Sequence, residues 1–409
     1  MEKPVAEMFA APPSHVPAHL VMDYDPQLEA DYAEKGWETY ARASQMLPPI
    51  IWSTAFGGGW MPMRAAIIRE VFRNWKLFSS RNASQSQFAR RLIPIDVDPP
   101  QHSVYRDILS HGFTPEAVAE MKDWVSGIAR EIVNGIASQG HCDFGEDIAD
   151  IMPNIIFTKL AGLPQEDARK LNLWARRILS MFEPPEERSR LEQEAIAYLT
   201  AVIDQRRRNP KNDMISKIIA AEHNGAKLSE DETLDFCYLL FIGGLDTMTN
   251  AMAHVFYLLA QRPDKQAEIL TCIDDDGKLA NEAEELLRMA PIIRTTRTVT
   301  RDVEFHGIQM RAGDHVILHT GIANFDAAEN PNPCEPQFNR RQQHLTFGVG
   351  RHYCMGAHLA RLETIALLRE WFKRIPSFRL QPGSVQRYIP GMVAISNVKL
   401  EWDKTQAFL

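Results

Sequence analysis

The chain has 409 residues, 45% of them hydrophobic, and a formal net charge of −8 at pH 7. An acidic chain argues against nucleic acid or an anionic membrane as the main partner, because both favour a basic surface. Five scattered cysteines without a CxxC pair argue against a disulfide framework and against a zinc or dithiol site. The first twenty residues carry prolines and charges where a signal peptide needs an apolar run, so we expect a cytoplasmic protein.

The chain shows no linker, internal repeat or low-complexity tract. Clusters of Gly and Pro at 57–60 and 183–187 are short and lie between apolar segments, which is typical of turns. We therefore expect one domain over residues 1–409, with an irregular N-terminal segment over about residues 1–25.

Taken in chain order, most segments have the periodicity of helices. A strand is predicted at 48–56, and apolar residues at three- and four-residue spacing predict helices at 117–140 and 191–209. Alternation around Ala312 and Gly313 predicts a hairpin over 303–320. The pattern indicates a mainly α fold with small β-sheets.

The longest apolar run, residues 236–263, raises the question of a membrane span. Asp246, Asn250 and His254 fall inside it, and an unpaired charge in a single span is costly. We predict instead a long helix through the protein core, ended by Pro263.

That core helix contains the first candidates for chemistry. Gly243 and Gly244 weaken its middle, and the Thr247 hydroxyl can bond to the carbonyl four residues earlier, which opens the helical ladder locally. Asp246 beside Thr247 then offers a carboxylate and a hydroxyl for a proton relay. A simple kink with a capped or solvated Asp246 accounts for the same residues, and both interpretations stay open.

Two further pairs are weak signals by themselves. Glu285 and Arg288 lie three apart on one predicted helix face, a spacing that is common on exposed helices. His102 and Arg106 lie four apart after a Pro-Pro pair and present two donors suited to a carboxylate or a phosphate. Plain surface helices account for both pairs as readily.

The stretch FGVGRHYCMG, residues 347–356, places Cys354 among glycines and directly before a helical pattern at 355–375. The free N–H groups and the dipole of a helix N-terminus stabilise a thiolate there. The sulfur can then be a ligand of haem iron, whose other ligands need not come from the protein. A nucleophile near His352 and a buried structural cysteine remain as alternatives.

The order of the three motifs closely resembles the signature series of the cytochrome P450 superfamily, with greatest likeness to the bacterial camphor-hydroxylase branch. The motifs are GGLDT (243–247), EELLR (284–288) and the cysteine loop, in which FxxGxxxCxG is matched by Phe347, Gly350, Cys354 and Gly356. The likeness extends through most of the chain. It implies the P450 fold, with haem b between the long central helix and the helix after the cysteine loop, and a monomeric monooxygenase.

The resemblance also assigns roles residue by residue. Cys354 is the expected proximal ligand of the haem iron, and its negative charge favours cleavage of the O–O bond. Asp246 and Thr247 are expected to stabilise bound oxygen and to deliver protons, and Glu285 and Arg288 to form a structural pair. The expected donors to the haem propionates are His102, Arg106, Arg297 and His352.

Two departures from the family pattern concern the structural pair and the substrate. Many relatives have an arginine where this chain has Gln337, which weakens the expected third partner of the Glu–Arg pair. Camphor-type relatives hold the substrate ketone with a tyrosine, yet residues 81–100 contain none, so camphor itself is not expected.

The substrate-pocket positions carried over from the family are mostly apolar, and each is equally suited to a plain core. Together they imply a compact lipophilic substrate such as a terpenoid or a norisoprenoid, for example an ionone. They are Phe88, Met181, Phe182, Leu239, Ile242, Gly243, Ile293, Met392 and Val393.

Electrons must come from another protein, since the sequence has no flavin or nicotinamide fingerprint. The resemblance implies an acidic two-iron two-sulfur ferredoxin, reduced by a flavoprotein reductase, with O₂ as the oxidant. Lys76, Arg106 and Arg351 are the expected docking surface on the haem's proximal side. A haem-thiolate sensor or carrier without turnover and a cysteine hydrolase are the competing classes.

Overall fold

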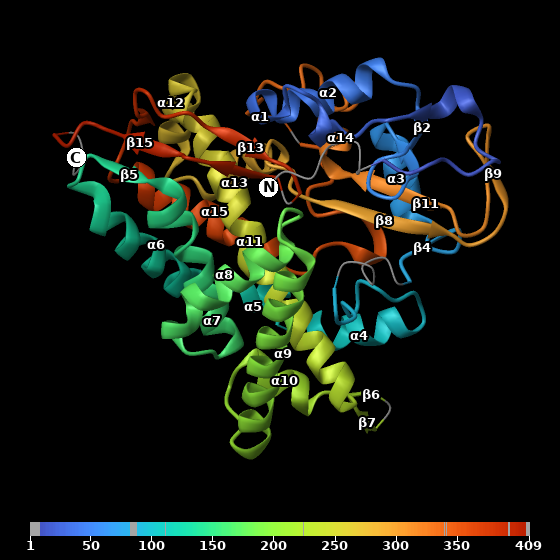
Figure 1. The fold of residues 1–409 in the computed structure, drawn as a ribbon. Coiled ribbons are helices and arrows are strands. Elements are labelled where there is room, and N and C mark those ends of the chain that lie inside the picture. The colour runs from blue at the N-terminus through green and yellow to red at the C-terminus, as the bar shows by residue number, and fades with distance from the viewer. Residues whose placement is uncertain are drawn as a thin grey trace.

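The computed structural model describes residues 9–81, 88–110, 112–223, 225–338, 340, 342–391 and 393–405. Its helices are α1 (Tyr32–Lys35), α2 (Trp37–Met46), α3 (Ala65–Arg73), α4 (Gln101–Ser110), α5 (Pro115–Ala119), α6 (Lys122–Ala137), α7 (Met152–Ala161), α8 (Ala168–Leu179), α9 (Pro185–Arg208), α10 (Met214–Ala220), α11 (Glu230–Ala260), α12 (Pro263–Cys272), α13 (Asp276–Arg288), α14 (Thr320–Asn324) and α15 (Ala357–Phe372). Figure 1 shows α6 to α10 on one side of the molecule and most of the β-structure on the other, with α11 between them.

The strands are short and form small sheets. They are β1 (Val21–Met22), β2 (Ile50–Ser53), β3 (Gly59–Pro62), β4 (Phe78–Ser79), β5 (His141–Asp143), β6 (Glu222–His223), β7 (Ala226–Lys227), β8 (Arg294–Val299), β9 (Val303–Phe305), β10 (Ile308–Met310), β11 (His315–His319), β12 (Arg379–Leu380), β13 (Arg387–Ile389), β14 (Ala394–Ser396) and β15 (Lys399–Glu401). The largest sheet has the order β1-β2-β3-β11-β8-β4. The expectation of a mainly α fold with small sheets is confirmed.

The N-terminal segment is tied to this sheet. Within residues 9–25, a 3-10 turn at Ala18–Leu20 leads into β1, which pairs in parallel with β2. Phe9 also forms an isolated bridge with Ala55.

The long helix α11 begins earlier than the apolar run predicts. A capping box starts it: the Ser229 Oγ accepts from the Glu232 N–H at 3.1 Å, and the Glu232 Oε2 accepts from the Ser229 N–H at 2.8 Å. The helix ends at Ala260, and Pro263 opens the first turn of α12 rather than ending α11. No helix of the described ranges combines the length and the apolarity that a membrane span requires.

The hairpin predicted around Ala312 and Gly313 turns at a different place. The structure pairs β9 with β10 across His306 and Gly307, whose φ angles are 49° and 80°. Two successive positive φ angles are what a tight two-residue hairpin requires. The Gly313 turn instead leads the chain into β11, which pairs with β8 in the large sheet.

Two helix boundaries also differ from the predicted ones. The helix expected at 117–140 is divided into α5 and α6, because the chain makes a turn between them at Glu120 and Met121. The helix α9 begins at Pro185, inside the Pro-Pro pair that was predicted as a turn, because proline at the first helical position loses no hydrogen bond.

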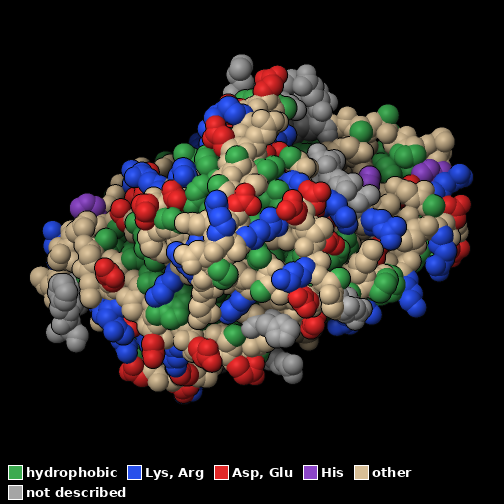
Figure 2. All heavy atoms as spheres, turned by 90° about the horizontal axis from the view of Figure 1, so that it is seen from below, with side chains coloured by type: hydrophobic (Ala, Val, Ile, Leu, Met, Phe, Trp, Pro, Cys, Tyr) green, Lys and Arg blue, Asp and Glu red, His purple; other side chains and the backbone are tan. Residues whose placement is uncertain are grey.

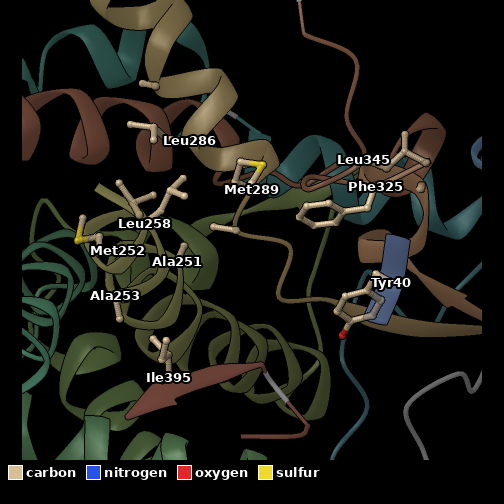
Figure 3. Packing of buried hydrophobic residues seen from close by; sticks show 14 of the residues in the cluster. Tyr40, Ala251, Met252, Ala253, Leu258, Leu286, Met289, Phe325, Leu345 and Ile395 are labelled. Carbon is tan, nitrogen blue, oxygen red and sulfur yellow. The ribbon is translucent and has the colours of Figure 1, made fainter. Parts of the chain in front are cut away.

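The hydrophobic core has two clusters, and α11 contributes to both. Its first half, including Phe236 and Leu245, packs in one cluster, and its second half, including Met252 and Leu259, packs in the other. Figure 3 shows the second half of α11 beside Leu286 of α13 and Ile395 of β14. The central helix is therefore fixed by packing along most of its length.

Candidate functional site

The cysteine loop is held by its backbone and by two glycines. The Cys354 N–H donates to the Phe347 carbonyl at 2.8 Å, which closes the loop in front of α15. Gly348 and Gly350 have φ angles of 66° and 80°, which favour glycine. Gly350 also lies against α3, where an added Cβ would be 3.3 Å from the Phe72 carbonyl oxygen. The loop geometry therefore depends on glycine at both positions.

The Cys354 thiol lies just before the N-terminus of α15, as the sequence predicts. Burial raises its pKa, whereas the Gly356 and Ala357 N–H groups and the charges of Arg106 and Arg361 lower it. Burial is the largest of these effects, so the helix terminus alone does not produce a thiolate. A cation bound to the sulfur deprotonates a thiol outright.

Cys354 nevertheless retains accessible surface, although the surrounding protein is close enough to raise its pKa by burial. This combination fits a group that lines an internal space. Gly243, in the middle of α11, is also exposed, although Phe241, Ile242 and Leu245 beside it are buried. A Cβ added to Gly243 would meet only Leu239 Cδ1, at 4.0 Å. At the neighbouring Gly244, by contrast, a Cβ would be 2.6 Å from the Phe157 ring. One glycine faces open space and the other is packed.

Basic side chains from α4, β8 and the cysteine loop converge. The rings of His102 and His352 are 4.3 Å apart, and the charges of Arg297 and Arg106 act on the His352 ring. Burial lowers the pKa of His102 to about 4, that of His352 to about 2 and that of Arg297 to about 10, with nearby positive charges adding to the effect on the histidines. We call His102, Arg106, Arg297 and His352 the basic cluster.

His102 and Arg297 of the basic cluster are buried, Arg106 and His352 are half-buried, and the cluster is poorly paired. Within the described part of the chain, both ring nitrogens of His102 and Nε2 of His352 have no hydrogen-bond partner. Arg297 donates from Nη1 to the Thr296 carbonyl at 2.6 Å and to Thr295 Oγ1 at 3.3 Å. Buried polar groups without partners are costly, so donors in this arrangement fit an anionic acceptor. The cluster, the exposed thiol and the open face of Gly243 fit haem b with its carboxylates.

On α11, Thr247 makes the bond that the sequence predicts: its Oγ1 donates to the Gly243 carbonyl at 2.9 Å. Asp246 is buried, and its Oδ2 accepts from Asn250 Nδ2 at 2.9 Å. The other carboxylate oxygen, Oδ1, has no hydrogen-bond partner among the described residues. Burial raises the pKa of Asp246, and the charge of Arg176 opposes that rise.

Arg176 is a residue that sequence reasoning missed. Its Nε lies 3.6 Å from Asp246 Oδ1, and its Nη2 contacts Asp150 Oδ1 at 2.5 Å. It comes from α8 and its side chain is 47% exposed, so it links the buried carboxylate of α11 to the surface. No spacing or motif in the sequence relates these three residues, because they come from α8, α11 and the end of the turn Gly145–Ala149 and meet only in the fold.

Glu285 and Arg288 form a fully buried pair rather than a surface pair, each side chain being 1% exposed. Arg288 donates from Nε and Nη2 to both carboxylate oxygens, at 2.8 and 2.9 Å, and from Nη1 to the Asn324 carbonyl at 2.8 Å. Gln337 is the third partner after all, because its backbone N–H donates to Glu285 Oε1 at 2.7 Å. A main-chain amide supplies the donor that the sequence seemed to lack.

A second ion network lies beside the cysteine loop and was not predicted. Glu284 accepts from Arg361 Nη2 at 2.9 Å and lies 2.9 Å from His344 Nε2. Arg361 also donates from Nη1 to the Tyr353 hydroxyl at 2.9 Å. Burial tends to raise the pKa of Glu284, but His344 and Arg361 lower it to about 2.

The expected pocket residues come from several separate segments of the chain. Leu239, Ile242 and Gly243 occupy one stretch of α11, and Phe88 packs against the same hydrophobic cluster. Val393 is buried beyond β13, and Ile293 accepts at its carbonyl from both the N–H and the hydroxyl of Thr320. The remaining three positions are Met181, which is half-buried, Phe182, which is 44% exposed, and Met392, which lies outside the described residues.

Two of the three residues of the expected docking surface lie together. Arg106 and Arg351 line one pocket of about 280 Å³ with His102, and Arg351 covers the Trp75 ring at 5.5 Å. Lys76 is exposed and follows Trp75 in the chain.

Comparisons with known proteins agree with this geometry. Residues 165–391 match the family model "Cytochrome P450". The chain is 33% identical over 368 residues to the probable cytochrome P450 127A1 of Sinorhizobium fredii, covering 87% of each protein. It is 33% identical over 306 residues to the mycinamicin IV hydroxylase/epoxidase of Micromonospora griseorubida, covering 73% of this chain and 76% of that one. The crystal structure of CYP101J2 aligns with a TM-score of 0.85 at 31% identity, over 96% of this chain and 100% of the other.

The fold, the cysteine loop and these relatives define an oxygen-activating haem protein. The chain belongs to the cytochrome P450 family. It is a P450 monooxygenase that binds haem b, a cofactor that this family holds through a cysteine thiolate. The similarity to CYP101J2 agrees with the branch that the sequence resembles.

Proposed function

We propose that this monooxygenase hydroxylates a small lipophilic substrate, a terpenoid or a norisoprenoid such as an ionone, with electrons from a two-iron two-sulfur ferredoxin. One oxygen atom of O₂ enters a C–H bond, and the other leaves as water with two protons and two electrons. The observation that carries the substrate class is the apolar stretch of α11, where Leu239 and Ile242 precede the open face of Gly243.

Two groups of residues are proposed to hold the cofactor, one at the iron and one at the haem carboxylates. Cys354 is the proposed ligand of the iron, and the basic cluster is proposed to bind the two haem carboxylates. The bound haem supplies the activation of O₂. Neutralising the carboxylates also relieves the cost of burying Arg297 and the unpaired histidine nitrogens.

Proton delivery is assigned to Asp246 and Thr247. The Thr247 hydroxyl proton is committed to the Gly243 carbonyl, so its oxygen is an acceptor toward the open side of the helix. Asp246 Oδ1 has no hydrogen-bond partner among the described residues, and Arg176, whose Nε is 3.6 Å away, lies between this atom and the surface. We propose that protons pass from solvent beside Arg176, which itself stays charged, to Asp246 and then to the Thr247 hydroxyl.

The ferredoxin is proposed to dock at Lys76, Arg106 and Arg351. Basic and acidic side chains are interleaved on the face that Figure 2 shows, so that face offers no surface of a single charge. A local basic surface beside the cysteine loop attracts an acidic partner even on a chain of net charge −8.

The chain is also proposed to act as one domain, because α11 contributes to both core clusters.

The first test is the absorption spectrum of the purified, reduced protein with carbon monoxide, followed by titration of the ferric form with β-ionone. A red-shifted Soret band supports thiolate ligation, and a low- to high-spin change on titration supports the substrate class. A histidine-like band in folded, haem-loaded protein contradicts the assignment of Cys354. A normal band without any spin change leaves the ligand in place and rejects the ionone class.

The second test separates the relay from a haem-thiolate sensor, which needs no proton delivery. Thr247→Ala is expected to divert electrons to hydrogen peroxide, lowering the ratio of product to electrons consumed. Thr249→Ala is the matched control, because the Thr249 hydroxyl is buried and donates to Ala149 and Leu245 on the far side of the helix. Unchanged coupling in Thr247→Ala, or equal loss in both variants, rejects the role of Thr247.

A further inference from the structure

Gln27, a residue of the N-terminal region, is hydrogen-bonded to the turn between β13 and β14. Gln27 lies in a 3-10 turn at Pro26–Leu28 and is 3% exposed. Its Oε1 accepts from the Gly391 N–H at 2.8 Å, and its Nε2 donates to the Gly391 carbonyl at 3.4 Å and to the Tyr40 hydroxyl at 2.9 Å. One side-chain amide thus pairs with both backbone groups of a residue that is 364 positions away in the chain.

Gln27 is itself held by a buried acid. Asp25 Oδ1 accepts from the Gln27 N–H at 2.9 Å, which fixes the 3-10 turn. The other oxygen of Asp25 lies 3.0 Å from His319 Nε2 on β11 and 3.6 Å from Arg294 Nη1 on β8. Arg294 directly follows Ile293, a proposed pocket residue. The short segment 25–27 therefore connects the strand next to Ile293 with the β13–β14 turn.

The turn is fixed on its other side by α11. The Val393 carbonyl lies 2.6 Å from His254 Nε2, and Val393 has a φ of 45°, which is rare for a β-branched residue. His254 follows Thr247 by two helical turns, so both residues lie on the same helix face, about 10 Å apart along the axis. The turn is thus placed at one end of the α11 face that bears Thr247.

The turn also meets the segment after α8. Gly391 has a φ of 101°, and a Cβ added there would lie 3.6 Å from Met181 Cγ and Sδ. Met181 and Val393 are both proposed pocket residues. A displacement of Gly391 therefore changes the spacing between two proposed walls of the pocket.

We propose that Gln27 is a positioning residue for substrate specificity: by fixing Gly391 it sets how far the β13–β14 turn reaches toward Met181, and so the bulk of the ligand that fits. Gln27 touches neither substrate nor cofactor in this scheme. The inference rests on the proposed function, and its pocket residues are those that the family resemblance assigns.

The structure offers a matched control for this proposal. Gln266 is buried to the same degree and pairs in the same way with a backbone segment, donating to the Phe378 and Leu259 carbonyls and accepting from the Phe378 N–H. None of its partners is a proposed pocket residue. Gln266→Met removes a comparable set of hydrogen bonds elsewhere and reports any general loosening of the fold.

The experiment uses the full haem-loaded chain and three variants: Gln27→Met, Gln266→Met and Tyr40→Phe. Hydrogen exchange of peptides covering Gly391 reports the pairing directly and needs no haem chemistry. Binding of imidazole and of the bulkier phenylimidazole, followed through the Soret band, reports pocket size. Tyr40→Phe removes one bond of Gln27 and leaves its pairing with Gly391 in place.

Gln27→Met is expected to exchange about tenfold faster around Gly391 and to change the affinity ratio of phenylimidazole to imidazole severalfold. Gln266→Met and Tyr40→Phe are expected to leave both quantities near wild type. Unchanged exchange at Gly391, an unchanged affinity ratio, or the same change in Gln266→Met overturns the proposal. A wild-type protein without the thiolate-type carbon monoxide band overturns the proposed function instead, and the exchange result still decides whether Gln27 holds the turn.

Discussion

The pair Glu285–Arg288 and the two buried members of the basic cluster, His102 and Arg297, differ in how their polar groups are paired. Arg288 donates to both carboxylate oxygens of Glu285 and to the Asn324 carbonyl, and Glu285 also accepts from the Gln337 N–H. In the basic cluster, three ring nitrogens of His102 and His352 have no partner in the described part of the chain. Burial alone does not separate a structural network from a binding site, whereas the state of the hydrogen bonds does.

The difference has a physical basis. A buried charge is tolerated when its partner and hydrogen bonds offset the loss of hydration. The Glu–Arg pair contains its own compensation, so it supports the fold without a ligand. In the basic cluster Arg297 donates to Thr295 and Thr296, but three histidine ring nitrogens have no partner among the described residues, so we propose that a bound anion completes the compensation. We call the Glu285–Arg288 pair the closed network, because it is compensated without a ligand, and the basic cluster the open region, because it is not. We expect the two regions to respond differently to mutation.

The largest effect is expected at the sulfur next to the open region. Cys354→Ala removes the proposed iron ligand, so the thiolate-type carbon monoxide band is expected to vanish completely. Cys334→Ala is the control, since Cys334 is only half-buried and lies outside the cysteine loop. A band that survives in Cys354→Ala would contradict the assignment.

The closed network is expected to be sensitive to loss of one partner. Arg288→Met leaves Glu285 buried without its counter-charge, which costs about 3–5 kcal/mol of unfolding free energy. The double variant Glu285→Gln/Arg288→Met leaves no charge behind and is expected to cost less than Arg288→Met alone. Denaturant unfolding of the three proteins checks this, and a costlier double variant would show that packing rather than charge dominates.

The network of Glu284, His344 and Arg361 is also paired without a ligand, and its contribution to stability is expected to depend on pH. Its pKa is lowered from 4.5 to about 2 by His344 and Arg361 against the effect of burial. A carboxyl with a lowered folded-state pKa stabilises the fold above its ordinary pKa and loses that contribution as the pH falls toward the folded value. The stability difference between wild type and Glu284→Gln is therefore expected to be on the order of 2–3 kcal/mol at neutral pH and to shrink between about pH 4.5 and pH 2. A pH-independent difference would point to packing instead.

The smallest effect on stability is expected in the open region. Arg297→Met removes a buried charge for which the described residues show no salt bridge, although Asp98 and Asp96 act on it from farther away, so the unfolding free energy of the haem-free protein is expected to change by less than about 1 kcal/mol. The same variant loses a charge-assisted bond to the bound carboxylate, so its haem affinity is expected to fall about 10- to 100-fold. Thermal unfolding of haem-free protein and competition for haem by apomyoglobin measure the two quantities. A large loss of stability in the haem-free protein would place Arg297 in the closed class.

Local sequence patterns predicted what local structure determines. The back-bond of Thr247, the helix at His102 and Arg106, and the cysteine before α15 follow from spacings of four residues or fewer. Local patterns failed where two turns compete: both Gly307 and Gly313 have positive φ angles, but only His306 adds the second positive φ that a tight hairpin needs.

Contacts between distant segments could not be predicted in the same way. The Arg176–Asp246 contact joins two helices, and the Gln27–Gly391 pairing spans 364 positions, so neither leaves a spacing in the sequence. The backbone N–H of Gln337 shows a further limit, because a main-chain donor is the same whatever side chain occupies the position. Residue identity predicted a weakened network there, and the fold supplied the bond.

The adjacent glycines of α11 differ in how well they tolerate substitution. An added methyl group at Gly244 collides with Phe157, whereas at Gly243 it meets only the end of Leu239 at 4.0 Å. Alanine is also the better helix former by about 1 kcal/mol. Larger side chains at position 243 are therefore expected to be accommodated without loss of the fold, and each added carbon there narrows the space beside Thr247. Position 244 is closed to such substitution, so new specificities are expected to arise from one member of the pair.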